Sequence, residues 1–181
     1  MKIAMQQFPA RLFSRRAWRG LLFTMLALGL SIVAAAAVLE GRVVAVTDGD
    51  TVKVLDANKF EHVVRLSGID APEKRMPFGQ RSKQNLSDLV YGRWVEVEGE
   101  KNDRYGRLVG KVLVKGRDAN LAQIQAGMAW HYKEYQREQT VPDRRMYAEA
   151  ESMASMAKRG LWTDHNPVPP WDWRKARRRK D

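Results

Sequence analysis

Two short runs of β-forming residues with acidic ends constrain the fold of this chain more than any other feature. The first run covers residues 51–56 and the second covers residues 60–67. The turn between them is short enough to make the two strands antiparallel neighbours. In that pairing, Asp50 at the start of the first strand lies beside Asp70, just past the end of the second.

Two carboxylates brought together at the rim of a sheet repel each other unless a cation lies between them. Asp50 and Asp70 therefore predict a divalent-metal site, with Arg65 and Glu73 at its edge. The chain has no cysteine, so a thiolate site is excluded and a hard, oxygen-ligated ion such as Ca²⁺ is the natural occupant. Asp48 either binds the metal, supports Asp50 by a hydrogen bond or simply forms the turn.

The net charge of +11 first suggests a nucleic-acid binder, but its distribution does not support that reading. Residues 1–36 hold five basic residues and no acid, and residues 174–181 hold six basic residues and one acid. Residues 37–173 keep 21 basic and 20 acidic residues, so the body of the chain is almost neutral. Any electropositive site must therefore be local. The basic run at the end contacts nucleic acid, contacts anionic lipid or is simply solvated.

Residues 1–37 read as a signal peptide or an N-terminal membrane anchor. A basic stretch precedes an uncharged run of 18 residues, Leu21 to Val38, that ends in four alanines. The alanines favour cleavage after Ala36 or nearby, whereas the length of the run is at the lower limit for a membrane span. Arg15 and Arg16 also resemble a twin-arginine signal. We expect the protein to be exported, periplasmic or secreted, or else membrane-anchored with its domain facing outward.

The remaining pattern predicts an α+β fold that is mainly β. Expected strands cover 40–47, 51–56, 60–67, 93–100 and 107–114, and expected helices cover 80–91, 118–127 and 142–158. Five short strands with three helices favour a barrel of the oligonucleotide-binding (OB) type over residues 38–163. The last helix is expected to bury a stripe that includes Met146 and Met153. Residues 164–181 are expected to form an extended basic tail containing prolines and tryptophans. No protein partner is indicated, and a monomer is expected.

Three sequence motifs resemble the staphylococcal (micrococcal) nuclease family. They are DGDT at 48–51, Arg65 followed by GIDAPE at 68–73, and DRYGR at 103–107. The likeness runs from about Val43 to Trp162. It implies an OB-fold enzyme that hydrolyses phosphodiester bonds in DNA and RNA and depends on Ca²⁺.

The resemblance also implies which residues hold the metal. It places the calcium ligands at the carboxylates of Asp50 and Asp70 and at the main-chain carbonyl of Ala71. Ala71 stands where the best-known member of the family has threonine, and only the carbonyl is used there. This donor set leaves coordination positions open for water and a phosphate oxygen.

The family's two phosphate-binding arginines fall on Arg65 and Arg107, and its general base or water-orienting acid falls on Glu73. These roles suit the chemistry, because attack on a phosphodiester builds negative charge that a cation and forked guanidinium groups stabilise. A carboxylate is also needed to orient a water molecule or take its proton.

Aromatic residues after the second helix are expected to stack on a base of the substrate. The family often has two tyrosines two residues apart at this point, and counting from Gly127 places them at Lys133 and Tyr135. Trp130 and Tyr132 are nearby aromatic residues. We therefore expect substrate contacts from Tyr132, Lys133 and Tyr135.

Two functions remain open at this point. The first is an exported Ca²⁺-dependent endonuclease with little sequence preference. The alternative is a non-catalytic OB-fold module that binds nucleic acid or a protein. A degenerate module would be expected to lose metal or phosphate ligands, and all five expected side chains are present, which favours the enzyme.

Overall fold

Five strands with apolar side chains on alternate residues close into a barrel. The computed structural model describes residues 38–179. The barrel strands are β1 (Val38–Asp48), β2 (Thr51–Asp56), β3 (Glu61–Leu66), β5 (Trp94–Asn102) and β6 (Leu108–Val114). They follow the order β3-β2-β1-β5-β6 with antiparallel neighbours, and a parallel pairing of β3 with β6 closes the ring. The predicted five-stranded OB-type barrel is confirmed.

The inward residues of these strands form the core. Val64 and Leu66 are buried, whereas Val63 and Arg65, which precede them in turn, are only partly covered, so burial alternates along β3. Because successive side chains of a strand point to opposite faces, this alternation sends Arg65 away from the apolar interior. The fully buried valines of the other strands include Val52, Val54, Val97 and Val112.

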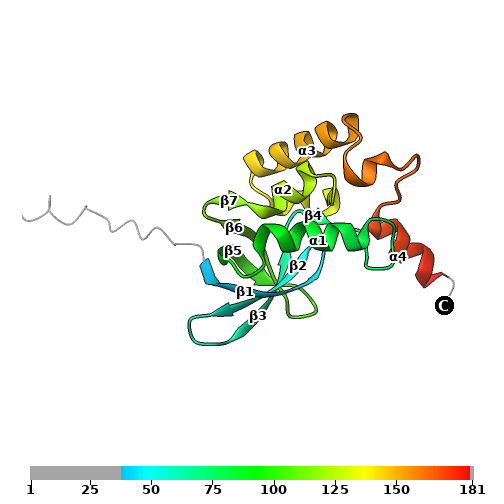
Figure 1. Ribbon diagram of the computed structural model, residues 1–181. Coiled ribbons are helices and arrows are strands. Elements are labelled where there is room, and N and C mark those ends of the chain that lie inside the picture. The colour runs from blue at the N-terminus through cyan, green and yellow to red at the C-terminus, as the bar shows by residue number, and fades with distance from the viewer. Residues whose placement is uncertain (1–37, 180–181) are drawn as a thin grey trace, which may run out of the picture. The chain divides into compact units, whose positions relative to one another are not determined.

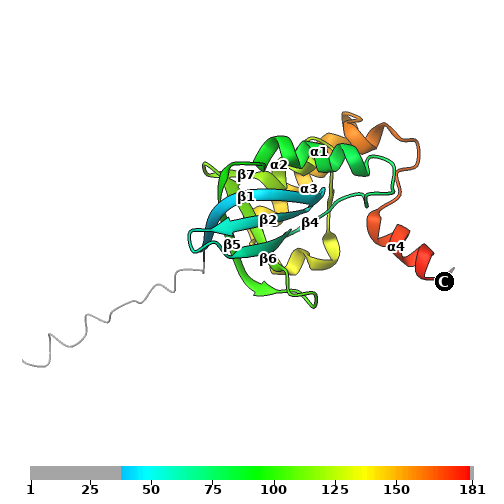
Figure 2. The same ribbon diagram turned by 60° about the horizontal axis from the view of Figure 1, so that its bottom comes forward.

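Three helices cover one side of the barrel (Figures 1 and 2). They are α1 (Gly79–Val90), α2 (Ala119–Gln125) and α3 (Val141–Met156). The short strand β7 (Arg117–Asp118) pairs with β6 and leads into α2. The side chain of Asp118 accepts a hydrogen bond from the Leu121 N–H at 2.9 Å and so caps the N-terminus of α2.

The buried face of α3 differs from the prediction. Met146 and Met153 are 44% and 53% exposed, so the expected methionine stripe is wrong. The buried residues are Tyr147, Ala150, Glu151 and Ala154, which also follow helical spacing. The aromatic ring of Tyr147 fills the space beneath α3, and its hydroxyl donates a hydrogen bond to Asp118 at 2.8 Å. The two stripes lie close together on one helix, and packing against the barrel selects the second.

Two short strands fix the loops around the barrel rim. β4 (Ile69–Asp70) pairs antiparallel with β8 (Trp130–His131), which joins the segment after β3 to the segment after α2. The 3₁₀ helices η1 (Lys133–Glu138) and η2 (Gly160–Thr163) follow β8 and α3 respectively. The β4–β8 pair therefore brings the expected metal-binding segment next to the expected substrate-binding segment.

The C-terminal segment is not extended as predicted. Residues Pro170–Arg178 form helix α4, which lies apart from α1, α2 and α3, as the red helix in Figures 1 and 2 shows. Pro170 suits the first turn of a helix because proline lacks the N–H that would be unpaired there. None of the helices described for residues 38–179 has the length and apolar character needed to cross a membrane. The expected signal or anchor, 1–37, lies outside the described residues.

Candidate active site

The turn between β1 and β2 sets Asp50 at the rim of the barrel. A Cβ atom at Gly49 would lie 1.9 Å from Ser82 Oγ and 2.7 Å from Ala71 Cβ, so only glycine lets the turn pack this closely against its neighbours. Asp48 Oδ1 accepts a hydrogen bond from the Asp50 N–H at 3.2 Å. Asp48 therefore supports Asp50, one of the roles expected for it.

Arg65 joins the two carboxylates expected to bind metal. Its place in β3 is opposite Thr51, the residue after Asp50. The Arg65 guanidinium forms an ion pair with Asp50 through Nη1, and its Nη2 lies 2.8 Å from Asp70 Oδ1. The side chain of Asp70 is 1% exposed and that of Arg65 is 14% exposed. The strand register thus brings Asp50 and Asp70 within reach of one cation.

Backbone contacts hold the loop that carries Asp70. Asp70 pairs with Trp130 in the β4–β8 sheet. The N–H of Ala71 donates a hydrogen bond to Asp50 Oδ2 at 2.7 Å, and Ala71 is buried. The expected metal-binding residues Asp50, Asp70 and Ala71 are therefore direct neighbours.

Burial raises the pKa values of two carboxyl groups at this rim. Burial, followed by the nearby charge of Asp50, raises the pKa of Asp48 to about 7. Burial also raises the pKa of Asp70, against the hydrogen bond from Arg174 and the charge of Arg65. Both shifts mean that the ionised carboxylates are poorly solvated, so a cation bound beside them is strongly favoured.

Glu73 lies in the loop between β4 and α1. Its side chain is 41% exposed, and its carboxylate accepts a hydrogen bond from Arg174 Nη1 at 2.8 Å. The same guanidinium contacts both oxygens of Asp70. Glu73 and Asp70 are therefore close enough to share one arginine, which places the expected general base beside the expected metal ligand.

Arg107, the second expected phosphate-binding arginine, pairs with a different carboxylate. It directly precedes β6, two residues before Val109, which pairs with Arg65. Its guanidinium binds Asp103, with both Nε and Nη2 at 2.7 Å from Oδ2, and lies over the ring of Tyr105 at 5.5 Å. Asp103 also accepts hydrogen bonds from the backbone of this turn, as expected for a turn-forming residue. In this structure Arg107 pairs with its own hairpin.

The three expected substrate-binding residues divide between two environments. Tyr132 stacks on Trp171 of α4, with ring centroids 5.4 Å apart and planes 7° apart. Burial, followed by the hydrogen bond to Glu134, raises the pKa of Tyr132 to about 12. Lys133 instead pairs with Glu151 of α3, and Tyr135 is 46% exposed with its ring edge against Tyr132. Tyr132 is thus the member of this set that packs against the helix carrying Arg174.

Arg174 is the residue at this site that the sequence reading missed. Its Nη2 lies 2.7 Å from Asp70 Oδ2, and its Nη1 lies 2.8 Å from Glu73 Oε1. These two ion pairs raise its pKa further above its usual range, although burial acts in the opposite direction. The available signal was Trp171 and Trp173, because a solvated basic tail has no need of two large aromatic residues.

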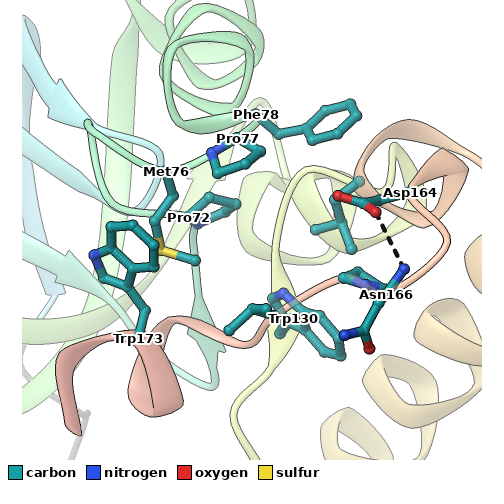
Figure 3. A pocket seen from close by; sticks show the side chains of 11 residues that line it. Pro72, Met76, Pro77, Phe78, Trp130, Asp164, Asn166 and Trp173 are labelled. Atoms are coloured by element: carbon teal, nitrogen blue, oxygen red, sulfur yellow. Dashed lines mark hydrogen bonds between the residues drawn. The ribbon is translucent and has the colours of Figure 1, made fainter. Parts of the chain in front are cut away.

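A small pocket borders the site on the side of α4. It measures about 110 Å³. Figure 3 shows Trp173, Met76 and Pro72 on one part of its wall and Trp130 on another. Asp164 and Asn166 lie on the remaining side, where the backbone N–H of Asn166 donates a hydrogen bond to Asp164 Oδ1 at 3.1 Å. Residues of α4 and of the loop that carries Glu73 therefore line the same pocket.

The donor set fits a hard cation. Within residues 38–179, no three side chains of His, Cys, Asp or Glu form a group that could hold a metal ion on their own. The expected set has only two such side chains, Asp50 and Asp70, with a main-chain carbonyl as its third member. Both carboxylates already bind one guanidinium cation, Arg65. Oxygen donors around a positive charge are the arrangement that Ca²⁺ prefers.

Comparison with known proteins agrees with this geometry. The family model described as "Staphylococcal nuclease homologue" matches residues 63–164. An "Uncharacterized endonuclease" of Escherichia coli is 42% identical over 137 residues, which cover 75% of this chain and 85% of the relative. A "Micrococcal nuclease" of Shigella flexneri is 40% identical over 146 residues, 76% of this chain and 81% of the relative. An "Uncharacterized endonuclease" of Haemophilus influenzae is 41% identical over 134 residues, 74% and 72% respectively.

These findings favour the enzyme over the non-catalytic binding module that the sequence had left open. The matched segment includes Arg65, Asp70, Glu73 and Arg107, and the barrel that it completes supplies Asp50. The chain belongs to the staphylococcal nuclease family and is a nuclease, a hydrolase of phosphodiester bonds.

Proposed function

We propose that this nuclease depends on Ca²⁺ and cleaves both DNA and RNA with little sequence preference. The observation that carries the proposal is the bridge that Arg65 makes between Asp50 and Asp70 at the barrel rim. In this bridge, two poorly solvated carboxylates face a single positive charge. Glu73 is linked to Asp70 because both residues form ion pairs with Arg174.

Asp50, Asp70 and the carbonyl of Ala71 would hold the calcium ion. All three supply oxygen, and three protein donors leave room for water and a phosphate oxygen within the six to eight positions of Ca²⁺. When bound, the ion supplies positive charge to the phosphate and lowers the cost of building negative charge on its oxygens.

The arginines would bind the phosphate during cleavage. Arg65 lies at the metal-binding carboxylates, so its fork can donate to a phosphate held there. Arg107 can reach the same phosphate only by leaving Asp103, and the phosphate charge supplies a competing partner. Two guanidiniums suit a transition state with two negative charges.

Glu73 would orient the attacking water and take its proton. Its side chain is 41% exposed, so water reaches it directly. It lies three residues beyond Asp70, and the arginine that the two residues share indicates that both point toward the same place. A carboxylate within reach of the water that attacks the phosphate can act as a general base.

Low sequence preference follows from the kind of groups at the site. Charged groups and a metal ion recognise the phosphate, which is the same at every position of the substrate. Tyr135, which is 46% exposed beside Tyr132, can stack on any base, because every base has an aromatic face. Both DNA and RNA present these features.

The test of the residue roles is cleavage of single-stranded DNA and RNA by Glu73→Gln and Arg107→Ala. We expect each to lower turnover on both substrates by about 100-fold or more, because general bases and phosphate-binding groups contribute effects of this size. Glu61→Gln and Arg104→Ala are matched controls that remove the same charges on β3 and in the 103–107 turn. Full activity in Glu73→Gln and Arg107→Ala, with unchanged melting temperatures, would remove the assigned roles.

The test of the metal is the same assay after chelation, followed by addition of Ca²⁺ or Mg²⁺. We expect chelation to abolish cleavage and Ca²⁺ to restore it. Asp50→Asn and Asp70→Asn should lose the restoration. Cleavage that continues in excess chelator contradicts the calcium dependence.

We also propose that the protein is exported, on the basis of the basic stretch and the apolar run within residues 1–37. The measurement is fractionation of expressing cells followed by determination of the N-terminal residue. A mature protein that begins near Ala37 indicates a cleaved signal, and an intact chain in the membrane fraction indicates an anchor. An intact chain in the cytoplasm contradicts export.

A further inference from the structure

Arg174 contacts the carboxylates that the proposed metal and the proposed general base require. Asp70 Oδ2 accepts a hydrogen bond from Arg174 Nη2 at 2.7 Å, and Asp70 Oδ1 accepts from Arg174 Nη1 at 3.3 Å. Glu73 Oε1 accepts from the same Nη1 at 2.8 Å. A single guanidinium from the end of the chain therefore binds both acidic residues of the loop after β3.

The oxygen of Asp70 that faces Arg174 is the one that remains for a metal ion. Asp70 Oδ1 already accepts the Arg65 hydrogen bond of 2.8 Å. Asp70 Oδ2 has Arg174 as its partner, and the side chain is only 1% exposed. Because a guanidinium and a calcium ion are both cations that need this oxygen, they cannot occupy it together.

The contact with Glu73 opposes its proposed function as well. Arg174 Nη1 holds Glu73 Oε1 in an ion pair of 2.8 Å, so this oxygen already has a partner. Glu73 must leave this contact before the same oxygen can accept a hydrogen bond from the attacking water. Arg174 in this position therefore obstructs two separate requirements of the reaction.

Packing of α4 holds Arg174 in place. Trp171 lies one helical turn before Arg174, on the same face of the helix. Its ring stacks on Tyr132 and meets the ring of Trp130 edge-on at 5.8 Å. Trp173 lines the pocket of Figure 3 together with residues of the loop that carries Glu73. These aromatic contacts dock the helix against β8 and the site loop, so the guanidinium is presented at a high local concentration.

The contact can nevertheless be broken. The Arg174 side chain is 37% exposed and that of Glu73 is 41% exposed, so water can replace their hydrogen bonds. α4 has only nine residues and no side-chain N-cap hydrogen bond. A divalent cation has twice the charge of the guanidinium and can contact Asp50 and Asp70 at once, so it can displace Arg174.

We propose that Arg174 is a tethered competitor of the divalent metal at Asp70, and that α4 docked in this way holds the nuclease in an inhibited state. This inference rests on the proposed calcium site. Metal binding requires the guanidinium to leave Asp70, and its departure also releases Glu73. The C-terminal helix thereby raises the calcium concentration at which the enzyme becomes active.

The test is calorimetric titration of Ca²⁺ into the purified full-length protein and three variants. Arg174→Ala removes the competitor, and we expect the Kd for Ca²⁺ to fall about tenfold, the size expected for loss of a charged, partly exposed contact. Arg174→Lys keeps the charge but loses the forked guanidinium, so its Kd for Ca²⁺ should lie between the values of the wild type and Arg174→Ala. Arg177→Ala removes the same charge from an exposed position on α4 and should leave the Kd within about twofold of the wild-type value.

A second measurement separates this inference from the function on which it rests. The Ca²⁺ concentration that gives half-maximal cleavage should fall in Arg174→Ala by the same factor as the Kd. An unchanged or higher Kd in Arg174→Ala, with cleavage still dependent on Ca²⁺, overturns the competition and leaves the calcium site intact. Absence of Ca²⁺ binding in every form overturns the calcium site and the competition with it.

Discussion

Arg65 and Arg174 both bind the carboxylate of Asp70, but the regions of the molecule that carry them differ. Arg65 belongs to a barrel strand whose backbone is paired on both sides, with Thr51 and with Val109. Its side chain is 14% exposed. Arg174 belongs to a nine-residue helix near the end of the chain, and its side chain is 37% exposed.

The difference teaches which part of the site is fixed and which part can open. Arg65 has its backbone held by strands on both sides and its side chain bound to both Asp50 and Asp70, so the barrel fixes its place at the site. Removing Arg174 requires only that a side chain turn or that a short helix separate from two aromatic rings, those of Trp130 and Tyr132. We therefore regard the strand region as the permanent frame of the site and α4 as its removable part.

The largest expected difference between the two regions is in the free energy of unfolding when each arginine is removed. Arg65→Ala leaves Asp50 and Asp70 buried without the cation between them, and we expect the free energy of unfolding to fall by about 3–5 kcal/mol. Arg174→Ala should cost about 1 kcal/mol or less, because solvent screens its ion pairs. Urea unfolding of both variants without metal measures the two losses. Equal losses would show that α4 is as much a part of the frame as β3.

A smaller effect is expected from the tight turn beneath Asp50. In Gly49→Ala the new methyl group would meet Ser82 Oγ and Ala71 Cβ at distances that no real contact allows, so the turn must move. We expect a loss of up to about 3 kcal/mol and weaker Ca²⁺ binding. Gly106→Ala is the control, since its Cβ would meet no atom within 4 Å and only its φ of 78° is strained, at about 1 kcal/mol. A larger loss in the control than in Gly49→Ala would contradict the steric explanation.

The removable part can be examined by amide hydrogen exchange. Trp171→Ala removes the stack on Tyr132, and such aromatic contacts contribute about 0.5–1.5 kcal/mol. Exchange in α4 should therefore become up to about tenfold faster, while exchange in β3 stays unchanged. Lys175→Ala, at an exposed position of the same helix, is the control. Faster exchange in β3 as well would show that the two regions open together.

The smallest expected effect is a pH dependence of the unfolding free energy that arises from His131. His131 lies in β8 opposite Ile69, and burial lowers its pKa below the ordinary 6.5. Above pH 6.5 the ring is neutral in both folded and unfolded chains. As the pH falls below 6.5, the unfolded chain binds a proton first, so this residue makes the folded state less stable.

The measurement is the difference in unfolding free energy between the wild type and His131→Gln from pH 7.5 to 5. A difference is needed because Asp48, with a pKa raised to about 7, stabilises the folded state as the pH falls through the same interval. The wild type should lose stability relative to His131→Gln below pH 6.5. A flat difference between the wild type and His131→Gln would contradict a buried neutral ring.

Much of the frame could be predicted because its determinants are local in sequence. The alternation of apolar residues defined the five strands, and the short connection between residues 56 and 61 defined the register that places Asp50 near Asp70. The three helices lie within a few residues of their predicted ranges. In each case neighbouring residues supply the signal, so no knowledge of distant contacts is needed.

Other features could not be predicted from local patterns. The stripe on α3 was misplaced because methionine and tyrosine are both apolar enough to be buried, and only the shape of the barrel surface chooses between them. The ion pair of Lys133 with Glu151 joins residues 18 positions apart, and no local pattern indicates it. The substrate contacts expected of Lys133 and Arg107 stay predictions.

The sequence by itself determined the barrel, its rim of acidic residues and the arginine between them, because strand alternation and short turns act over a few residues. Only the tertiary structure decided that Arg174, 104 residues beyond Asp70, lies against the same carboxylate. That contact depends on where α4 docks, and docking depends on aromatic surfaces that meet only after the barrel has closed. No local sequence pattern specifies the surface against which this short helix packs. Its position therefore follows from all its contacts in the folded chain.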